Sequence, residues 1–180
     1  MSDSAPVSRP MSPAPTVSRT GIPAGGKRYR LQADDETRDR MARELRLVSL
    51  DRFVADLTVE RASADGIRVF GQVDASLVQA CILTLADVPA EISETLDLTY
   101  SPHVRDTMED GEIVLDPNDE GPEPMDGESL NLADIAREHL VLAIDPYPKA
   151  SGAELDAELA TDAEASPFAA LAALKPPEGH

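Results

Sequence analysis

Residues 67–77 read IRVFGQVDASL, a long run in which apolar and polar side chains alternate. A period of two places every second side chain on the same face of a β-strand, so one face of this strand is expected to be buried and the other to meet water. The glycine in its middle, Gly71, predicts a bulge or a close approach by a neighbouring backbone. The alternation continues past residue 77 and assigns to the buried face Ile67, Val69, Gly71, Val73, Ala75, Leu77, Cys81 and Leu83.

Shorter alternating runs lie on both sides of this strand. Residues 53–60 alternate before it, with the turn sequence SADG at 63–66 in between, and residues 92–100 alternate after it. Consecutive strands that are joined by short turns and keep one polar face are typical of an antiparallel sheet. The three runs therefore predict an antiparallel β-meander or a partly open small barrel.

Two helical patterns flank the predicted strands, over residues 34–48 and 132–143. Asp34 or Asp35 is the expected N-cap of the first helix, and Asn131 caps the second with Asp134 in a capping-box arrangement. The predicted buried stripes are Thr37, Met41, Leu45 and Val48 in the first helix, and Leu132, Ile135, Ala136, Leu142 and Ala143 in the second. The predicted fold class is α+β, with the sheet packed by two to three helices.

Composition divides the rest of the chain. Residues 1–26 are rich in Pro, Ser, Ala and Gly and hold too little apolar surface to offset the entropy lost on ordering, so they predict a disordered tail. An α+β domain is expected over residues 27–150, with a flexible acidic loop at 103–128. Residues 151–180 predict an acidic linker followed by a C-terminal amphipathic segment.

The net charge of −18 is placed unevenly along the 180 residues. Residues 1–85 hold 12 Lys and Arg against 11 Asp and Glu, whereas residues 86–180 hold 4 against 23. An acidic half repels phosphate backbones and suits either a basic protein partner or simple solvation. No apolar run reaches transmembrane length and the first residues lack the apolar core of a secretory signal, so we expect a cytoplasmic protein without a membrane partner.

The sequence nominates no catalytic, metal-binding or cofactor-binding residue. Cys81 is the single cysteine, and His103, His139 and His180 have no second histidine or cysteine at a metal-ligand spacing. A phosphate-binding glycine loop, a dinucleotide-binding glycine motif and a nucleophile elbow are all missing from the sequence. The carboxylates at 106–112 would suit Mg²⁺, but a flexible loop does not hold them in a coordination geometry. We expect a protein that is not an enzyme, with no cofactor and no small-molecule substrate.

Two groups of residues are candidates for partner contacts. The first group lies in the sequence DPYPK at 145–149 and in SPFAALAALK at 166–175, where the second segment either packs on the chain's own sheet or docks on another protein. Its candidate partner-binding residues are Asp145, Tyr147, Phe168, Leu171, Leu174 and Lys175. The second group consists of basic residues at the start of the domain and in the first helix, and its candidate RNA contacts are Lys27, Arg28, Arg30 and Arg38. Salt bridges along that helix favour a solvated face for Arg38.

Three segments in this order resemble the bacterial YceD-type family, named for accumulation of large-subunit ribosomal RNA. The first segment, residues 71–85, is similar to the family's strand G-x-V-x-A-x-L-x-Q-x-C. The second is residues 132–140, which lead to Asp145-Pro146-Tyr147-Pro148. The third, residues 167–175, is similar to the family's closing sequence PFAxLxxLK. Many members have a second cysteine three residues after the first, where this chain has Thr84, so a thiol or metal role of that pair does not carry over. The resemblance implies a part in the synthesis, processing or stability of large-subunit rRNA and supplies no catalytic residue.

The expected function is therefore that of a non-enzymatic factor that supports accumulation or processing of 23S rRNA and ribosome assembly. Its expected partner is a basic ribosomal protein or an rRNA-processing factor, and direct contact with rRNA is left open. Two alternatives remain at this point. One is a Mg²⁺-dependent ribonuclease that uses the 106–112 acids, and the other is a regulatory docking protein without a ribosomal role.

Overall fold

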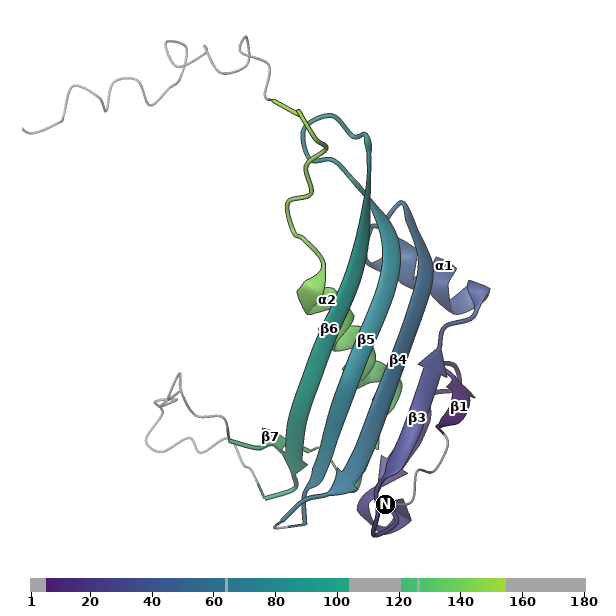
Figure 1. The fold of residues 1–180 in the computed structure, drawn as a ribbon, viewed down its shortest axis with the longest axis vertical. Helices are drawn as coiled ribbons and strands as arrows, with labels where there is room; N and C mark the ends of the chain where they lie inside the picture. The colour runs from purple at the N-terminus through teal and green to yellow at the C-terminus, as the bar shows by residue number, and fades with distance from the viewer. Residues whose placement is uncertain (1–5, 64, 104–120, 126, 155–180) are drawn as a thin grey trace, which may run out of the picture.

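The computed structural model describes residues 6–63, 65–103, 121–125 and 127–154 (Figure 1). The chain forms a six-stranded sheet, a two-stranded sheet and two α-helices within these residues. The strands are β1 (Val7–Pro10), β2 (Thr16–Ser18), β3 (Lys27–Gln32), β4 (Ser49–Arg61), β5 (Ile67–Ala80), β6 (Asp87–Ser101), β7 (Glu123–Pro124) and β8 (Ser129–Asn131). The helices are the 3₁₀ turn η1 (Arg19–Gly21), α1 (Asp35–Glu44) and α2 (Leu132–Ala143).

The large sheet has the order β1-β3-β4-β5-β6-β7, which follows the order of the chain. β4, β5 and β6 form the predicted antiparallel meander, and β3, which was not predicted as a strand from the sequence, pairs antiparallel with β4. At the two edges of the sheet, β1 pairs with β3 and β7 pairs with β6, both in parallel orientation, so the sheet as a whole is mixed. The sheet is open and does not close into a barrel (Figure 1). The α+β prediction is confirmed, and of the two predicted sheet arrangements the meander is the one found.

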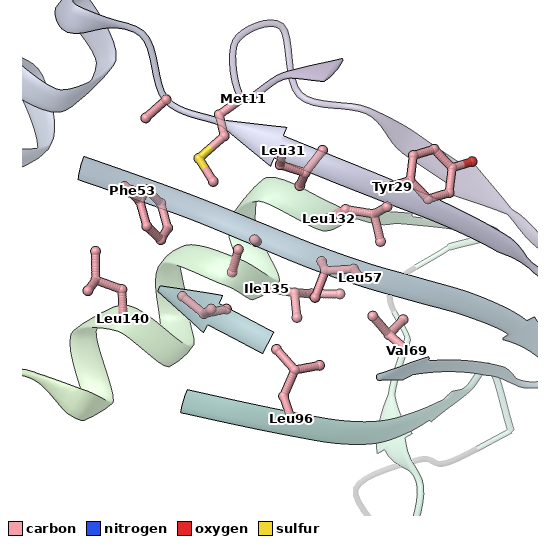
Figure 2. Close-up of a cluster of buried hydrophobic side chains, with 14 of the residues drawn as sticks. Met11, Tyr29, Leu31, Phe53, Leu57, Val69, Leu96, Leu132, Ile135 and Leu140 are labelled. Atoms are coloured by element: carbon pink, nitrogen blue, oxygen red, sulfur yellow. The ribbon is translucent and has the colours of Figure 1, made fainter. Parts of the chain in front are cut away.

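The hydrophobic core lies between one face of the meander and α2. The alternation read from residues 67–77 is confirmed, because Ile67, Val69 and Val73 are fully buried. Figure 2 shows Leu57, Val69 and Leu96 of the strands near Leu132, Ile135 and Leu140 of the helix. Both helices lie behind the sheet in Figure 1, and the opposite, polar face has no described element over it. We call that face the open face.

α2 has the predicted bounds because both of its ends carry local signals. The Asn131 side chain accepts hydrogen bonds from the backbone N–H groups of Ala133 and Asp134, at 3.0 and 3.3 Å. Pro146 follows its last turn and cannot continue a helix. The predicted buried stripe is wrong at Leu142, which is 74 % exposed, because the core contact of the last turn is made by Leu140 instead.

α1 begins as predicted and ends earlier. Asp34 caps it by accepting a hydrogen bond from the Thr37 N–H at 2.9 Å. The helix ends at Glu44 instead of Val48, because Arg46 adopts a positive φ of 56° and the Leu47 N–H bonds to the Ala42 carbonyl, which closes the last turn in a Schellman motif. Val48 is consequently exposed rather than buried.

The predicted disordered tail over residues 1–26 is wrong for residues 6–26. β1 pairs with β3, β2 pairs with β8, and Met11, Val17 and Ile22 are buried in the core. These few apolar side chains enter a core that the meander and α2 already form, so a low apolar content suffices for order. Residues 1–5, most of the predicted acidic loop (104–120) and the C-terminal region 155–180 lie outside the described residues.

Candidate partner-binding surfaces

The open face of the sheet is covered by polar side chains that bond to one another across strands. Arg68 of β5 makes two hydrogen bonds to Asp97 of β6, at 2.7 and 2.6 Å. This ion pair raises the pKa of Arg68 and lowers that of Asp97. Further contacts on this face join Arg30 to Asp56 at 2.7 Å, Gln72 to Ser93 at 2.6 Å and Ser76 to Glu91 at 2.7 Å. Many charges of this face are therefore matched within the sheet.

The four predicted RNA contacts do not form one patch. Arg28 and Arg30 lie on the open face of β3, and Arg30 is paired with Asp56. Lys27 lies on the opposite face of the strand, with its Nζ 5.0 Å from the centre of the Tyr29 ring. Arg38 lies on α1, where its guanidinium donates to the Ala33 carbonyl and to the Asp35 carboxylate, each at 2.9 Å. The structure thus divides this set between two strand faces and a helix.

Acidic residues gather on one side of the molecule. Because the sheet keeps the order of the chain, the N-terminal half lies toward β3 and the C-terminal half toward β6, with α2 packed against β5 and β6. Described residues up to 86 carry twelve Lys and Arg and ten Asp and Glu, whereas those after 86 carry two and ten. We call β6, β7, α2 and residues 144–154 together the acidic side.

Tyr100, near the end of β6, is a buried side chain that also lies near acidic residues. Burial, followed by the charges of Glu138 and Glu123, raises the pKa of Tyr100 to about 12. A negative field disfavours the ionised form of a phenol, as it disfavours any further anion. The acidic side is therefore a poor surface for a phosphate backbone and a favourable one for cations.

The segment DPYPK, which the sequence singled out, is bound to the end of the β5–β6 hairpin. The Gln79 side chain donates to the Asp145 carbonyl at 2.8 Å, and the Ile82 N–H donates to the Pro148 carbonyl at 2.9 Å. The Ala150 N–H donates to the Cys81 sulfur at 3.3 Å. Cys81 lies just beyond the strand, fully buried, and the predicted inward position of Leu83 is wrong because residues 82–84 form the turn.

The two candidates in this segment differ in what they contact. The Asp145 carboxylate accepts a hydrogen bond from the Tyr147 N–H at 2.8 Å and so holds the turn. The Tyr147 side chain is 70 % exposed. Leu85 in the neighbouring hairpin turn and Leu142 at the end of α2 are exposed to 78 % and 74 %. The sequence pattern placed Leu142 in a buried stripe and gave no prediction for Leu85, so neither leucine was a candidate contact residue.

Phe168, Leu171, Leu174 and Lys175 lie outside the described residues, as do the carboxylates at 106–112. Within the described ranges, no three His, Cys, Asp or Glu side chains are grouped to hold a metal ion. No helix in that part of the chain is long and apolar enough to cross a membrane.

Comparison with known proteins identifies a family. The family model described as large ribosomal RNA subunit accumulation protein YceD matches residues 69–175, which include the meander from β5 onward and α2. No curated protein and no solved structure matches the chain.

Proposed function

The chain belongs to the YceD family of large ribosomal RNA subunit accumulation proteins, and from that membership we propose how it takes part in the process. The family's description implies a role in accumulation of the large-subunit rRNA. We propose that the protein supports 23S rRNA accumulation in the cytoplasm by binding a basic ribosomal protein or rRNA-processing factor through its acidic side. It acts as a binding factor and catalyses no reaction.

The separation of charge across the sheet carries this proposal. Ribosomal proteins must neutralise RNA phosphates, so their surfaces are rich in Lys and Arg and associate non-specifically with anions. A surface with nine carboxylates and two cations among its described residues offers such a protein a complementary partner. The same surface repels free RNA, which favours recognition of the protein component over the rRNA.

The experiment reverses charge on each side of the molecule. Asp87 and Glu94 are exposed on β6, and Asp39 and Asp51 are exposed on and near α1. The Asp87→Lys/Glu94→Lys variant is compared with Asp39→Lys/Asp51→Lys, which changes the net charge equally. Cells that carry each variant in place of the natural protein are crosslinked, and both the bound proteins and the bound RNA are identified.

We expect the β6 variant to lose its basic protein partners by about tenfold or more and to lower mature 23S rRNA, while the α1 variant retains both, because complementary charge steers and orients such encounters. The recovery should fall when salt rises from low to physiological concentration, since surface charges are screened. Normal partner recovery and rRNA level in the β6 variant would overturn the proposal. Crosslinks to 23S rRNA alone, or cleavage of precursor rRNA by the purified protein, would also contradict it.

A further inference from the structure

The outer edge of β6 has a definite set of outward backbone groups. In an antiparallel pair, successive residues point their N–H and C=O alternately toward and away from the neighbouring strand. At one end of β6, the Met125 N–H donates to the Ser101 carbonyl, so Ser101 points away from β5 and toward β7. At the other end, the Cys81 N–H donates to the Ala86 carbonyl, so Asp87, one residue further, also points outward. The odd-numbered residues of β6 are therefore the outward set.

Pro89 agrees with this assignment. It belongs to the outward set, where a residue without an N–H leaves no gap in the pairing with β5. Among the described residues, β7 is the strand that pairs on the outer edge, and its register covers Tyr100 and Ser101. The edge from residue 91 to residue 99, about 30 Å long, meets no other described strand. Its outward N–H and C=O groups belong to Glu91, Ser93, Thr95, Asp97 and Thr99.

Natural proteins protect such edges with charge and with inward-facing ionic residues. Here the protecting charges are negative. Glu91 lies on the open face, as does Asp97, whose charge is paired with Arg68. Glu94 lies on the helix-side face of the strand, opposite Val73 of β5. The edge therefore disfavours a second copy of itself and favours an extended segment that carries cations.

We propose that the outer edge of β6 binds an extended, Lys- and Arg-rich segment of the partner protein as an added strand of the sheet. The proposal rests on the function proposed above and specifies how its partner is held. Backbone hydrogen bonds would supply affinity, and alternate side chains of the added strand would supply specificity. On the open face they meet Glu91 and Asp97, and on the helix side they meet the partly buried Ile92 and Leu98. The partner segment should alternate basic and apolar residues.

The test uses the full-length protein and a synthetic peptide of about nine residues with alternating lysine and valine, which matches the length of the open edge. Binding is followed by fluorescence anisotropy, and amide hydrogen exchange is followed by NMR. The control peptide has the same charges but carries N-methyl groups on alternate backbone nitrogens. We expect the outward amides at Ser93, Thr95 and Thr99 to gain protection, and the N-methylated peptide to bind at least about tenfold more weakly because it lacks several hydrogen-bond donors.

A pair of variants at Thr95 tests the protein side of the same bonds. Thr95→Pro removes one outward N–H at a position equivalent to that of Pro89, whereas Thr95→Ala removes the side chain and keeps the N–H. We expect Thr95→Pro to weaken peptide binding by about tenfold and Thr95→Ala to change it less than about threefold. Thermal unfolding verifies that the proline variant is folded. The N-methylated peptide on the unaltered protein tests the inference independently if it is not.

Equal binding of the two peptides would overturn the inference, since charge alone would then explain binding. Outward amides that are already protected in the free protein would overturn it as well, because the edge would already be paired. If Asp87→Lys/Glu94→Lys abolishes partner recovery in cells and Thr95→Pro leaves it unchanged, strand addition is wrong and the proposed function stands. If neither variant affects recovery, both are wrong.

Discussion

Cys81 is a fully buried side chain whose surroundings favour its ionised form. The hydrogen bond from the Ala150 N–H contributes most, and donors at Thr84 and Leu83 in the following turn add to it. Together they outweigh the cost of burial and lower the pKa of Cys81 from 9.0 to about 6. The same bond from Ala150 ties residues 145–150 to the hairpin. The predicted burial of Cys81 is confirmed, but the sequence did not indicate the Ala150 donor, which comes from a segment about seventy residues away.

This pKa makes stability depend on pH. Because the folded pKa is below the unfolded one, the unfolded state binds more protons between about 6 and 9.0, and the free energy of unfolding should rise with pH across that window. A Cys81→Ala variant should show a smaller rise. Urea denaturation at both ends of the window measures it, and equal slopes in the two proteins would contradict the assigned donors.

The pairing of β4 with β5 depends on a glycine. Gly71 has a φ of 153°, and a Cβ built on it would lie 2.0 Å from the backbone carbonyl oxygen of Asp56. No real Cβ tolerates that distance, so a side chain here would push the two strands apart. The close backbone approach predicted from its position in mid-strand is confirmed, although the sequence did not say which strand approaches.

Gly71→Ala should therefore lower the free energy of unfolding by about 3 kcal/mol, through strain at this strand contact. Gly25→Ala is the matched control, because a Cβ at Gly25 meets nothing within 4 Å. It should change stability by less than about 0.5 kcal/mol. Urea denaturation of both variants measures the difference, and similar values for the two would show that the strands can separate without cost.

Helix ends show which local signals are sufficient. α2 could be predicted to the residue because Asn131 caps its start and prolines follow its end. The end of α1 was missed because its left-handed residue is Arg46, whereas the sequence signal for such an end is a glycine or asparagine. The register of the next strand imposes this turn, since the Val48 N–H already bonds to the Val78 carbonyl of β5.

The N-terminal residues depend on the rest of the molecule for their order. Val17 is 4 % exposed in β2, and the Pro15 carbonyl accepts a hydrogen bond from the Leu132 N–H at the start of α2. By itself the segment lacks the apolar surface to fold, and packing against a core made elsewhere supplies it.

Val17→Ala should accordingly lower the free energy of unfolding by about 2 kcal/mol, because it leaves a cavity in a buried position. Ser8→Ala, on the exposed edge strand β1, should change it by less than about 0.5 kcal/mol. Chemical denaturation compares them. A Val17→Ala variant as stable as Ser8→Ala would mean that residues 6–26 contribute nothing to the folded state.

Periodicity and caps in the amino-acid order were enough for the meander, the two helices, the α+β class and the excess of acid in the second half, because each follows from side chains near one another in the chain. The proposed binding edge could not be found in this way. This edge exists because β6 is the last strand of the meander and because β6 pairs with β7 only at Tyr100 and Ser101. It also depends on which backbone groups of β6 point away from β5. Those are relations between segments distant in sequence, and they arise when the chain folds into one sheet.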